Sequence, residues 1–276
     1  MKPAWDDGED LVYPSLGFGG WVRAVRRGVP LILALTMAVI LHGIVRLIER
    51  PFTGHARPVS ARIVQGVCIL ALRLLGLKTR LHGEVMKAPG AVVANHASWL
   101  DIFVLNAHKR IFFVAKAEVR GWVGIGWLAR TAGTLFIRRD RREAKAHIDQ
   151  LRQRLEVGHR LLFFPEGTST DGRRVLPFKS TLFAPFFDEG LRNIASIQAV
   201  SVIYHAPEGL DPRYYGWWAG MDFAPSLLAI LATPRNGTVD LVCHKPHRIN
   251  EFTDRKSLAA DLERHVRAGL DSKISR

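Results

Sequence analysis

Residues 134–164 read TLFIRRDRREAKAHIDQLRQRLEVGHRLLFF, and this stretch decides the fold class. It begins and ends with short apolar runs of strand length, Thr134–Ile137 and Arg160–Phe164. Between them, within Arg141–Val157, apolar residues recur at helical spacing: Ala144, Ile148, Leu151 and Leu155. Gly158 then offers a natural helix end. A strand, a helix and a second strand form a βαβ unit, so the sequence predicts an α/β protein.

Similar apolar runs lie on both sides of this unit. The further candidate strands are Ala91–Ala94, Ile111–Ala115, Ser196–Tyr204 and Thr238–Cys243. A C-terminal helix is predicted over Ser257–Leu270, where apolar residues again follow the helical period. We therefore expect an α/β domain over residues 83–276, with a mixed sheet flanked by helices. An N-terminal helical region, residues 1–82, is expected to precede it and to associate with a membrane.

Two apolar segments in the N-terminal region support a membrane anchor. Val29–Val45 follows three arginines (23, 26 and 27) and would be about 25 Å long as a helix, which is the short end of a transmembrane span. Ala61–Leu77 carries Arg62 and Arg73 on one helical face, which suits a helix lying in the membrane interface.

These two segments allow three arrangements. The first segment could cross the bilayer once, with the preceding arginines favouring a cytoplasmic N-terminus. Alternatively, both segments could form a helical pair that dips into one leaflet. The third alternative is a pair of ordinary core helices without membrane contact.

The charge balance points to an anionic partner. The chain has 39 Lys+Arg against 25 Asp+Glu and a formal net charge of +14. Nucleic acid, an anionic membrane surface and a phosphorylated substrate would each explain this surplus. No recognised nucleic-acid motif is present, so we expect membrane lipids and no nucleic acid as partners. The two cysteines, Cys68 and Cys243, form no disulfide framework, which suits a reducing cytosolic setting.

The stretch AVVANHASWLD, residues 91–101, contains the first candidate catalytic pair. An apolar strand ends at Asn95, and Ser98 can cap a helix that begins at Trp99. Asp101 would then reach back toward His96 in the loop. A carboxylate beside an imidazole fixes the tautomer and stabilises the imidazolium, which makes the histidine a better general base. The alternative is that Asp101 only caps the helix and His96 is an ordinary loop histidine.

The stretch RLLFFPEGT, residues 160–168, ends a buried strand with a proline and a glycine that permits a tight turn. A carboxylate at Glu166 can orient an acceptor hydroxyl or brace a neighbouring arginine. On its own, this stretch is also compatible with an ordinary turn.

Cations follow several of the candidate strands. Arg138 and Arg139 end the strand that begins near Gly133, and arginine at such a position suits a phosphate or a carboxylate. Lys116 follows another strand, and Lys179 stands in the stretch PFKS, residues 177–180. For each of these cations, the alternative is a solvated surface charge.

Together, and in this order, these blocks resemble the bacterial lysophosphatidic acid acyltransferase family and its lyso-ornithine lipid relatives. The matching elements are the His-x4-Asp block at His96 and Asp101, the block ending at Arg138 and Arg139, and the FPEGT stretch at residues 164–168. The resemblance covers roughly residues 85–205. Such enzymes transfer a fatty acyl group from a thioester to the free hydroxyl of a lysolipid.

The resemblance also implies roles for individual residues. His96 is expected to be the general base and Asp101 its orienting partner. Glu166 and Gly167 would help to hold the acceptor, and Arg138 would bind its polar head. Further substrate-binding residues expected from their positions in the sequence are Arg139, Thr168, Lys116 and Lys179. The donor would be an acyl carrier protein or coenzyme A thioester, no cofactor or metal would be bound, and acyl carrier protein is an expected partner. The expected location is the bacterial inner membrane, with the active site facing the cytoplasm.

Two departures from the family pattern bear on the acceptor. Many phosphatidate-forming members have an arginine where this chain has Ser169, and often a proline before the valine that here follows Gln198-Ala199. The stretches STDG (169–172) and PFKS (177–180) and the aromatic run Tyr214–Trp218 are more similar to the lyso-ornithine lipid branch. We therefore favour lyso-ornithine lipid as acceptor, with lysophosphatidic acid as the alternative or as a second acceptor.

Three other classes of protein fit the sequence less well. A Ser/His/Asp hydrolase needs a Gly-x-Ser-x-Gly turn, which the sequence lacks. A metal enzyme is disfavoured because His244 and His247 stand three apart without a His-Glu-x-x-His or Cys/His cluster. A non-catalytic basic protein would explain the charge but not the three ordered blocks.

Overall fold

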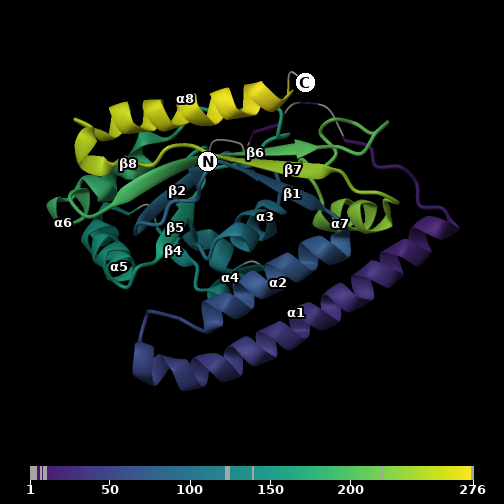
Figure 1. Ribbon diagram of the computed structural model, residues 1–276, viewed down its shortest axis with the longest axis horizontal. Helices are drawn as coiled ribbons and strands as arrows, with labels where there is room; N and C mark the ends of the chain where they lie inside the picture. Colours follow the sequence, from purple (N-terminus) through teal and green to yellow (C-terminus); the bar gives the residue numbers. More distant parts are fainter. Residues whose placement is uncertain are drawn as a thin grey trace.

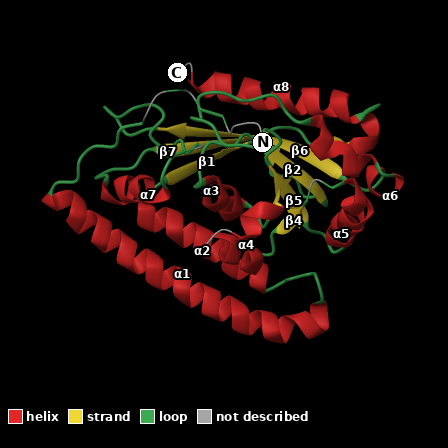
Figure 2. Ribbon diagram, turned by 180° about the vertical axis from the view of Figure 1, so that it is seen from behind, coloured by secondary structure: helices red, strands yellow, loops and turns green. Residues whose placement is uncertain are grey.

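The computed structural model describes residues 5–6, 8, 11–121, 125–138, 140–218 and 220–274. Two antiparallel helices, α1 (Phe18–Thr53) and α2 (Ser60–Leu75), lie side by side at one flank of the molecule (Figures 1 and 2). They contain both apolar segments that the sequence predicts as membrane-associated. α1 is long and apolar enough to cross a membrane, and only 11% of its most apolar 18-residue window is buried. The alternative of an ordinary core helix is therefore wrong for α1.

Polar contacts fasten both ends of α1 to the rest of the protein. Near its start, Arg23 Nε donates to the carbonyl of Ala232 at 2.6 Å, and Arg27 Nη1 donates to that of Thr233 at 2.6 Å. These carbonyls stand at the C-terminal end of α7 (Phe223–Ala232), where arginine satisfies otherwise unpaired acceptors. Near its end, Glu49 accepts from the backbone N–H of Val59 at 2.6 Å and so caps α2.

Eight strands of the described residues form one mixed sheet in the order β1-β7-β6-β2-β5-β3-β4, with β8 paired to β6. The strands are β1 (Lys78–His82), β2 (Gly90–Ala94), β3 (Phe112–Lys116), β4 (Leu135–Ile137), β5 (Arg160–Phe163), β6 (Ser196–His205), β7 (Thr238–Cys243) and β8 (His247–Arg248). The pairs among β6, β2, β5, β3 and β4 are parallel, whereas β7 and β8 run antiparallel to β6.

Helices cover both faces of the sheet, as Figure 1 shows: α2, α3 (Asp101–His108) and α7 on one side, and α8 (Arg255–Ile274) on the other. The central strand β2 is buried on both faces, because Val92 and Ala94 join one hydrophobic core while Ala91 and Val93 join the second. The remaining helices are α4 (Ile125–Ala132), α5 (Ala144–Glu156) and α6 (Glu189–Arg192), with 3₁₀ turns at Ala117–Gly121, Arg141–Glu143, Ser180–Phe187 and Ile249–Glu251.

The predicted α/β class and the mixed sheet flanked by helices are confirmed. All six predicted strands form, and so do the helices expected near Arg141–Val157 and Ser257–Leu270. Strand β1, strand β8 and helix α7 were not predicted. The proposed division at residues 82 and 83 stays a prediction, although β1, on its N-terminal side, pairs with β7 in the sheet.

Candidate active site

The parallel strands bring the predicted blocks to one edge of the sheet. Since β2, β5, β3 and β4 run in the same direction, the segments that follow them emerge together. His96 follows β2, Glu166 follows β5, Lys116 ends β3 and Arg138 follows β4. Open α/β sheets place their ligands at this carboxyl edge.

His96 and Asp101 form a hydrogen-bonded pair. The distance from His96 Nδ1 to Asp101 Oδ2 is 2.7 Å. The same carboxylate oxygen accepts from the backbone N–H groups of Ala97 and Ser98, so it fixes the loop as well as the imidazole. Asp101 is fully buried, whereas 23% of the His96 side chain is exposed. Because Nδ1 is held by the carboxylate, Nε2 is the ring nitrogen available for proton transfer.

The helix after His96 begins later than its sequence suggests. α3 starts at Asp101, not at Trp99, and Asp101 is the residue that captures the free N–H groups of the preceding loop. Ser98 instead accepts from the N–H of Leu100 through its hydroxyl at 3.3 Å. The loop N–H groups bind the Asp101 carboxylate in preference to the Ser98 hydroxyl, because a charged carboxylate accepts several hydrogen bonds and makes stronger ones.

Two aromatic residues contact the His96–Asp101 pair, and the sequence alone does not predict either contact. The Tyr204 hydroxyl donates to Asp101 Oδ1 at 2.6 Å, and burial raises the pKa of Tyr204, so it stays a donor. The Phe164 ring stacks on the His96 ring with 4.0 Å between centroids. Tyr204 comes from the end of β6, 103 positions from Asp101. In the sequence, the only indication of a role for Tyr204 is its place on the core-facing side of a predicted strand.

Glu166 accepts hydrogen bonds from the backbone of the His96 loop and of a second loop. Its two carboxylate oxygens accept from the backbone N–H groups of His96 at 2.8 Å and Leu176 at 2.7 Å. The side chain is only 1% exposed, and burial raises the pKa of Glu166 to about 8 against the opposing effect of these two donors. Both oxygens face the protein backbone, so Glu166 ties two loops together at the reaction site.

The turn after Glu166 packs against a lysine. Gly167 has a φ of +74°, and a Cβ at this position would come within 2.6 Å of Lys179 Nζ. The backbone N–H of Lys179 donates to Pro165 at 2.9 Å, which holds the lysine over the turn. Thr168 is half-buried, and the N–H of Thr170 closes the loop by donating to the His96 carbonyl at 2.9 Å.

The other predicted cations lie farther along the same edge. Arg138 is 67% exposed and pairs with Glu143 at 3.0 Å, and Lys116 is exposed beside it on β3. β4 is three strand spacings from β2 in the sheet, or about 14 Å. The side chain of Arg138 pairs with Glu143, and its place near the edge strand suits a different part of a long substrate from the part that meets His96. Arg139 lies outside the described residues.

Comparison with known proteins identifies the class of protein. A family model named Acyltransferase matches residues 78–202. The chain is 49% identical to a lyso-ornithine lipid O-acyltransferase of Rhodobacter capsulatus, over 99% of both chains. The chain belongs to this acyltransferase family. A lyso-ornithine lipid O-acyltransferase of Brucella abortus is 36% identical over 74% of this chain and 80% of the relative.

More distant relatives have a different acceptor in their names. A 1-acyl-sn-glycerol-3-phosphate acyltransferase of Neisseria gonorrhoeae is 34% identical over 64% of this acyltransferase and 68% of the relative. The crystal structure of the 1-acyl-sn-glycerophosphate acyltransferase PlsC from Thermotoga maritima has the same fold, with a TM-score of 0.59 and 22% identity, covering 91% of this chain and 98% of that one. The expected class of enzyme is confirmed.

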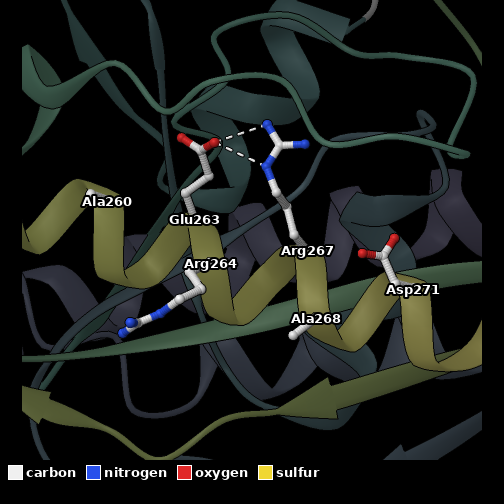
Figure 3. Close-up of a pocket in the computed structure, with 6 residues that line it drawn as sticks. All are labelled: Ala260, Glu263, Arg264, Arg267, Ala268 and Asp271. Atoms are coloured by element: carbon white, nitrogen blue, oxygen red, sulfur yellow. Dashed lines mark hydrogen bonds and ion pairs between the residues drawn. The ribbon is translucent and has the colours of Figure 1, made fainter.

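The long apolar helix α1, together with the lipid acyltransferase relatives, indicates that this acyltransferase associates with a membrane. A surface hollow elsewhere, along α8, is drawn in Figure 3. Its lining residues are Ala260, Glu263, Arg264, Arg267, Ala268 and Asp271. Arg267 pairs with Glu263 within it at 2.8 Å, and none of the three sequence blocks contributes to it, so this hollow does not mark the reaction centre.

Proposed function

We propose that this acyltransferase moves a fatty acyl group from an acyl carrier protein or coenzyme A thioester to the free hydroxyl of a lyso-ornithine lipid. The observation that carries the proposal is the His96–Asp101 pair at 2.7 Å, in a chain that resembles a lyso-ornithine lipid O-acyltransferase over nearly its full length.

In the proposed reaction, His96 Nε2 takes the proton of the acceptor hydroxyl as the oxygen attacks the thioester carbonyl. The new C–O bond forms a tetrahedral intermediate, which collapses by breaking the C–S bond. The imidazolium returns its proton to the departing sulfur, so the reaction yields an ester and a thiol without a covalent enzyme intermediate. Asp101 stabilises the imidazolium while the proton resides on it.

The position that distinguishes the acceptors supports lyso-ornithine lipid. Ser169 is buried where many phosphatidate-forming members carry an arginine, so this position offers no positive charge to a phosphate. Arg138 and Lys116 remain at the outer part of the edge, where they suit the carboxylate of an ornithine head group. Lysophosphatidic acid is the second candidate, because the Neisseria relative is named for that acceptor class.

The deciding experiment offers each acceptor separately to purified, detergent-solubilised enzyme with acyl carrier protein thioester as donor. Product from lyso-ornithine lipid supports the proposal, and product from lysophosphatidic acid alone would refute the acceptor assignment. Repetition with coenzyme A thioester compares the two donors. The His96→Ala variant controls for non-enzymatic transfer and should form no product with either donor.

We further propose that α1 and α2 lie in the cytoplasmic leaflet of the bacterial inner membrane, with the reaction site facing the cytoplasm. The supporting observation is that Arg23 and Arg27 bind the start of α1 to α7, while Arg57, just beyond its end, donates to the carbonyl of Thr131 at 3.1 Å. These contacts disfavour a helix that leaves the domain to cross the bilayer.

This arrangement can be tested by labelling with a membrane-impermeant maleimide in vesicles of known orientation. Ser15→Cys and His55→Cys place exposed thiols beyond either end of α1. Asp149→Cys marks the catalytic domain, and Cys68→Ala and Cys243→Ala remove the native thiols. We expect the maleimide to label all three cysteines from the same side of the membrane. Labelling of Ser15→Cys and His55→Cys from opposite sides would show that α1 spans.

A further inference from the structure

A cluster of two histidines and an aspartate lies away from the reaction site. His247 belongs to β8, and Asp261 and His265 are one turn apart on α8. β8 pairs with the beginning of β6, His247 facing Ile197, whereas Tyr204 of the reaction site is near the other end of that strand. The fold thus joins residues that are 14 positions apart in the sequence and have no recognisable metal-binding spacing.

The distances within the cluster differ from those of hydrogen-bonded pairs. Asp261 Oδ2 is 3.5 Å from His247 Nε2 and 3.3 Å from His265 Nδ1. This oxygen is buried and accepts no hydrogen bond from the described residues, whereas the other carboxylate oxygen pairs with Arg264. A buried carboxylate oxygen without a donor requires a compensating positive charge or a ligand.

A second trio of the same composition in this protein provides the contrast. His82 Nε2 and His205 Nε2 bind the two oxygens of Asp240 at 2.8 Å and 2.7 Å, which are ordinary hydrogen-bond lengths. At Asp261 the corresponding separations are longer by more than 0.5 Å. The 3.5 Å between His247 Nε2 and Asp261 Oδ2 is close to the edge of a tetrahedron around a Zn²⁺ ion with bonds of about 2.0–2.1 Å.

The surroundings supply the support that a metal-binding histidine requires. Glu251 Oε2 lies 3.5 Å from His247 Nδ1, on the ring nitrogen opposite the one that faces Asp261. His265 Nδ1 lies 2.9 Å from the backbone carbonyl of Asp261, an interaction that fixes the ring and leaves Nε2 as a possible ligand atom. The contact of His265 with the Asp261 carbonyl is of the kind that metal-binding histidines typically make, and Glu251 places a carboxylate near the corresponding nitrogen of His247.

We propose that His247, Asp261 and His265 bind a divalent transition-metal ion of the Zn²⁺ class. One nitrogen from each histidine and one aspartate oxygen lie within 4.8 Å of one another, which allows all three to reach one ion. Two imidazoles and one carboxylate are ligands that Zn²⁺ accepts, and water would fill the fourth position. The ion would link β8 to α8 and so stabilise the C-terminal part of the fold. This site is independent of the acceptor assignment.

The test is Zn²⁺ binding to the full-length enzyme in detergent, without an affinity tag and after treatment with a chelator. We expect about one Zn²⁺ per chain by elemental analysis after gel filtration, and a melting temperature that rises with added Zn²⁺. His247→Ala, His265→Ala and Asp261→Asn should each lose stoichiometric binding and this rise. Glu251→Gln should weaken affinity about 10- to 100-fold through His247.

Two matched variants remove histidines elsewhere: His55→Ala in an exposed turn, and His205→Ala in the hydrogen-bonded trio. Both should bind Zn²⁺ like the wild type. Equal melting temperatures of all variants without metal establish that they fold. Asp261→Asn should preserve the metal-free melting temperature best, because asparagine is isosteric with aspartate. The proposal is refuted if the wild type binds no Zn²⁺, if binding survives all three ligand substitutions, or if His205→Ala abolishes it.

Discussion

Replacing Asp101 with asparagine removes one negative charge from beside His96 while keeping the size of the side chain. The amide oxygen can take over the acceptor role of Oδ2 toward the His96 ring and the loop N–H groups, and the amide NH₂ can donate to the Tyr204 hydroxyl. The histidine loop therefore has the means to keep its conformation. What the variant loses is the charge that stabilises the imidazolium.

The size of this loss follows from the 2.7 Å separation of His96 Nδ1 and Asp101 Oδ2. With an effective dielectric constant of about 20, two unit charges at this distance attract by about 6 kcal/mol. Because the imidazole is partly exposed, solvent screening reduces this value, and we take about 4–5 kcal/mol as the loss in the transition state. At about 1.4 kcal/mol per tenfold, kcat should fall roughly 10³- to 10⁴-fold.

The assay is steady-state acyl transfer by Asp101→Asn with saturating donor and varied acceptor. We expect kcat to fall by the stated factor, while the acceptor KM changes less than about threefold, because the charge acts mainly after binding. Asp149→Asn, which changes the same side chain on the exposed face of α5, should retain wild-type kcat. A loss of less than tenfold in a variant with wild-type melting temperature would refute the role assigned to Asp101.

Three further substitutions test the surrounding groups. Arg138→Ala should raise the acceptor KM with little change in kcat or melting temperature, because the side chain is 67% exposed; an unchanged KM excludes it from acceptor binding. Glu166→Gln loses one backbone hydrogen bond and should destabilise the fold by about 1–3 kcal/mol at pH 5. Burial raises the pKa of Glu166 to about 8, above its unfolded value, so the stability that its protonated form contributes is lost as pH rises from about 5 through 8. The melting temperature of the wild type should therefore fall relative to that of Glu166→Gln as pH rises over that range, and a rise of the wild type relative to the variant would contradict the assignment. Gly167→Ala should lower the free energy of unfolding by about 1–2 kcal/mol through the positive φ alone, and denaturant unfolding measures this loss. The new Cβ would also clash with Lys179, and an additional Lys179→Ala should recover only the part of the loss that is due to this clash.

The parts of the site that could be predicted from the sequence are those determined by short-range chemistry. His96 and Asp101 are five positions apart at the junction of a strand and a helix, where a carboxylate in the first turn naturally faces the preceding loop. The strands were predictable for a related reason: in an α/β sheet the central ones are buried on both faces and form continuous apolar runs.

The missed parts depend on contacts between distant segments. Tyr204 reaches Asp101 across 103 positions, and Glu166 reaches the His96 backbone across 70. Helix α7 was missed because its apolar run is short and lacks a polar face, so its period carries no clear signal. In the sequence Arg23 and Arg27 resemble flanking charges of a membrane segment, whereas in the fold they bind the carbonyls at the end of α7.

The loop containing His96 is held by two segments that meet only in the folded protein, the start of α3 and the loop that follows β5. Asp101 binds its ring and its following N–H groups, Glu166 binds its own N–H, and Thr170 binds its carbonyl. Glu166 and Thr170 flank the turn that also carries Gly167, so the loop after β5 fixes the backbone of His96, and we expect it to position His96 for the reaction. In this chain the Phe-Pro-Glu-Gly-Thr block and the loop after it complete the backbone hydrogen bonds of the His-x4-Asp block, and a histidine can act as general base only when it is held at a defined distance from the reacting hydroxyl.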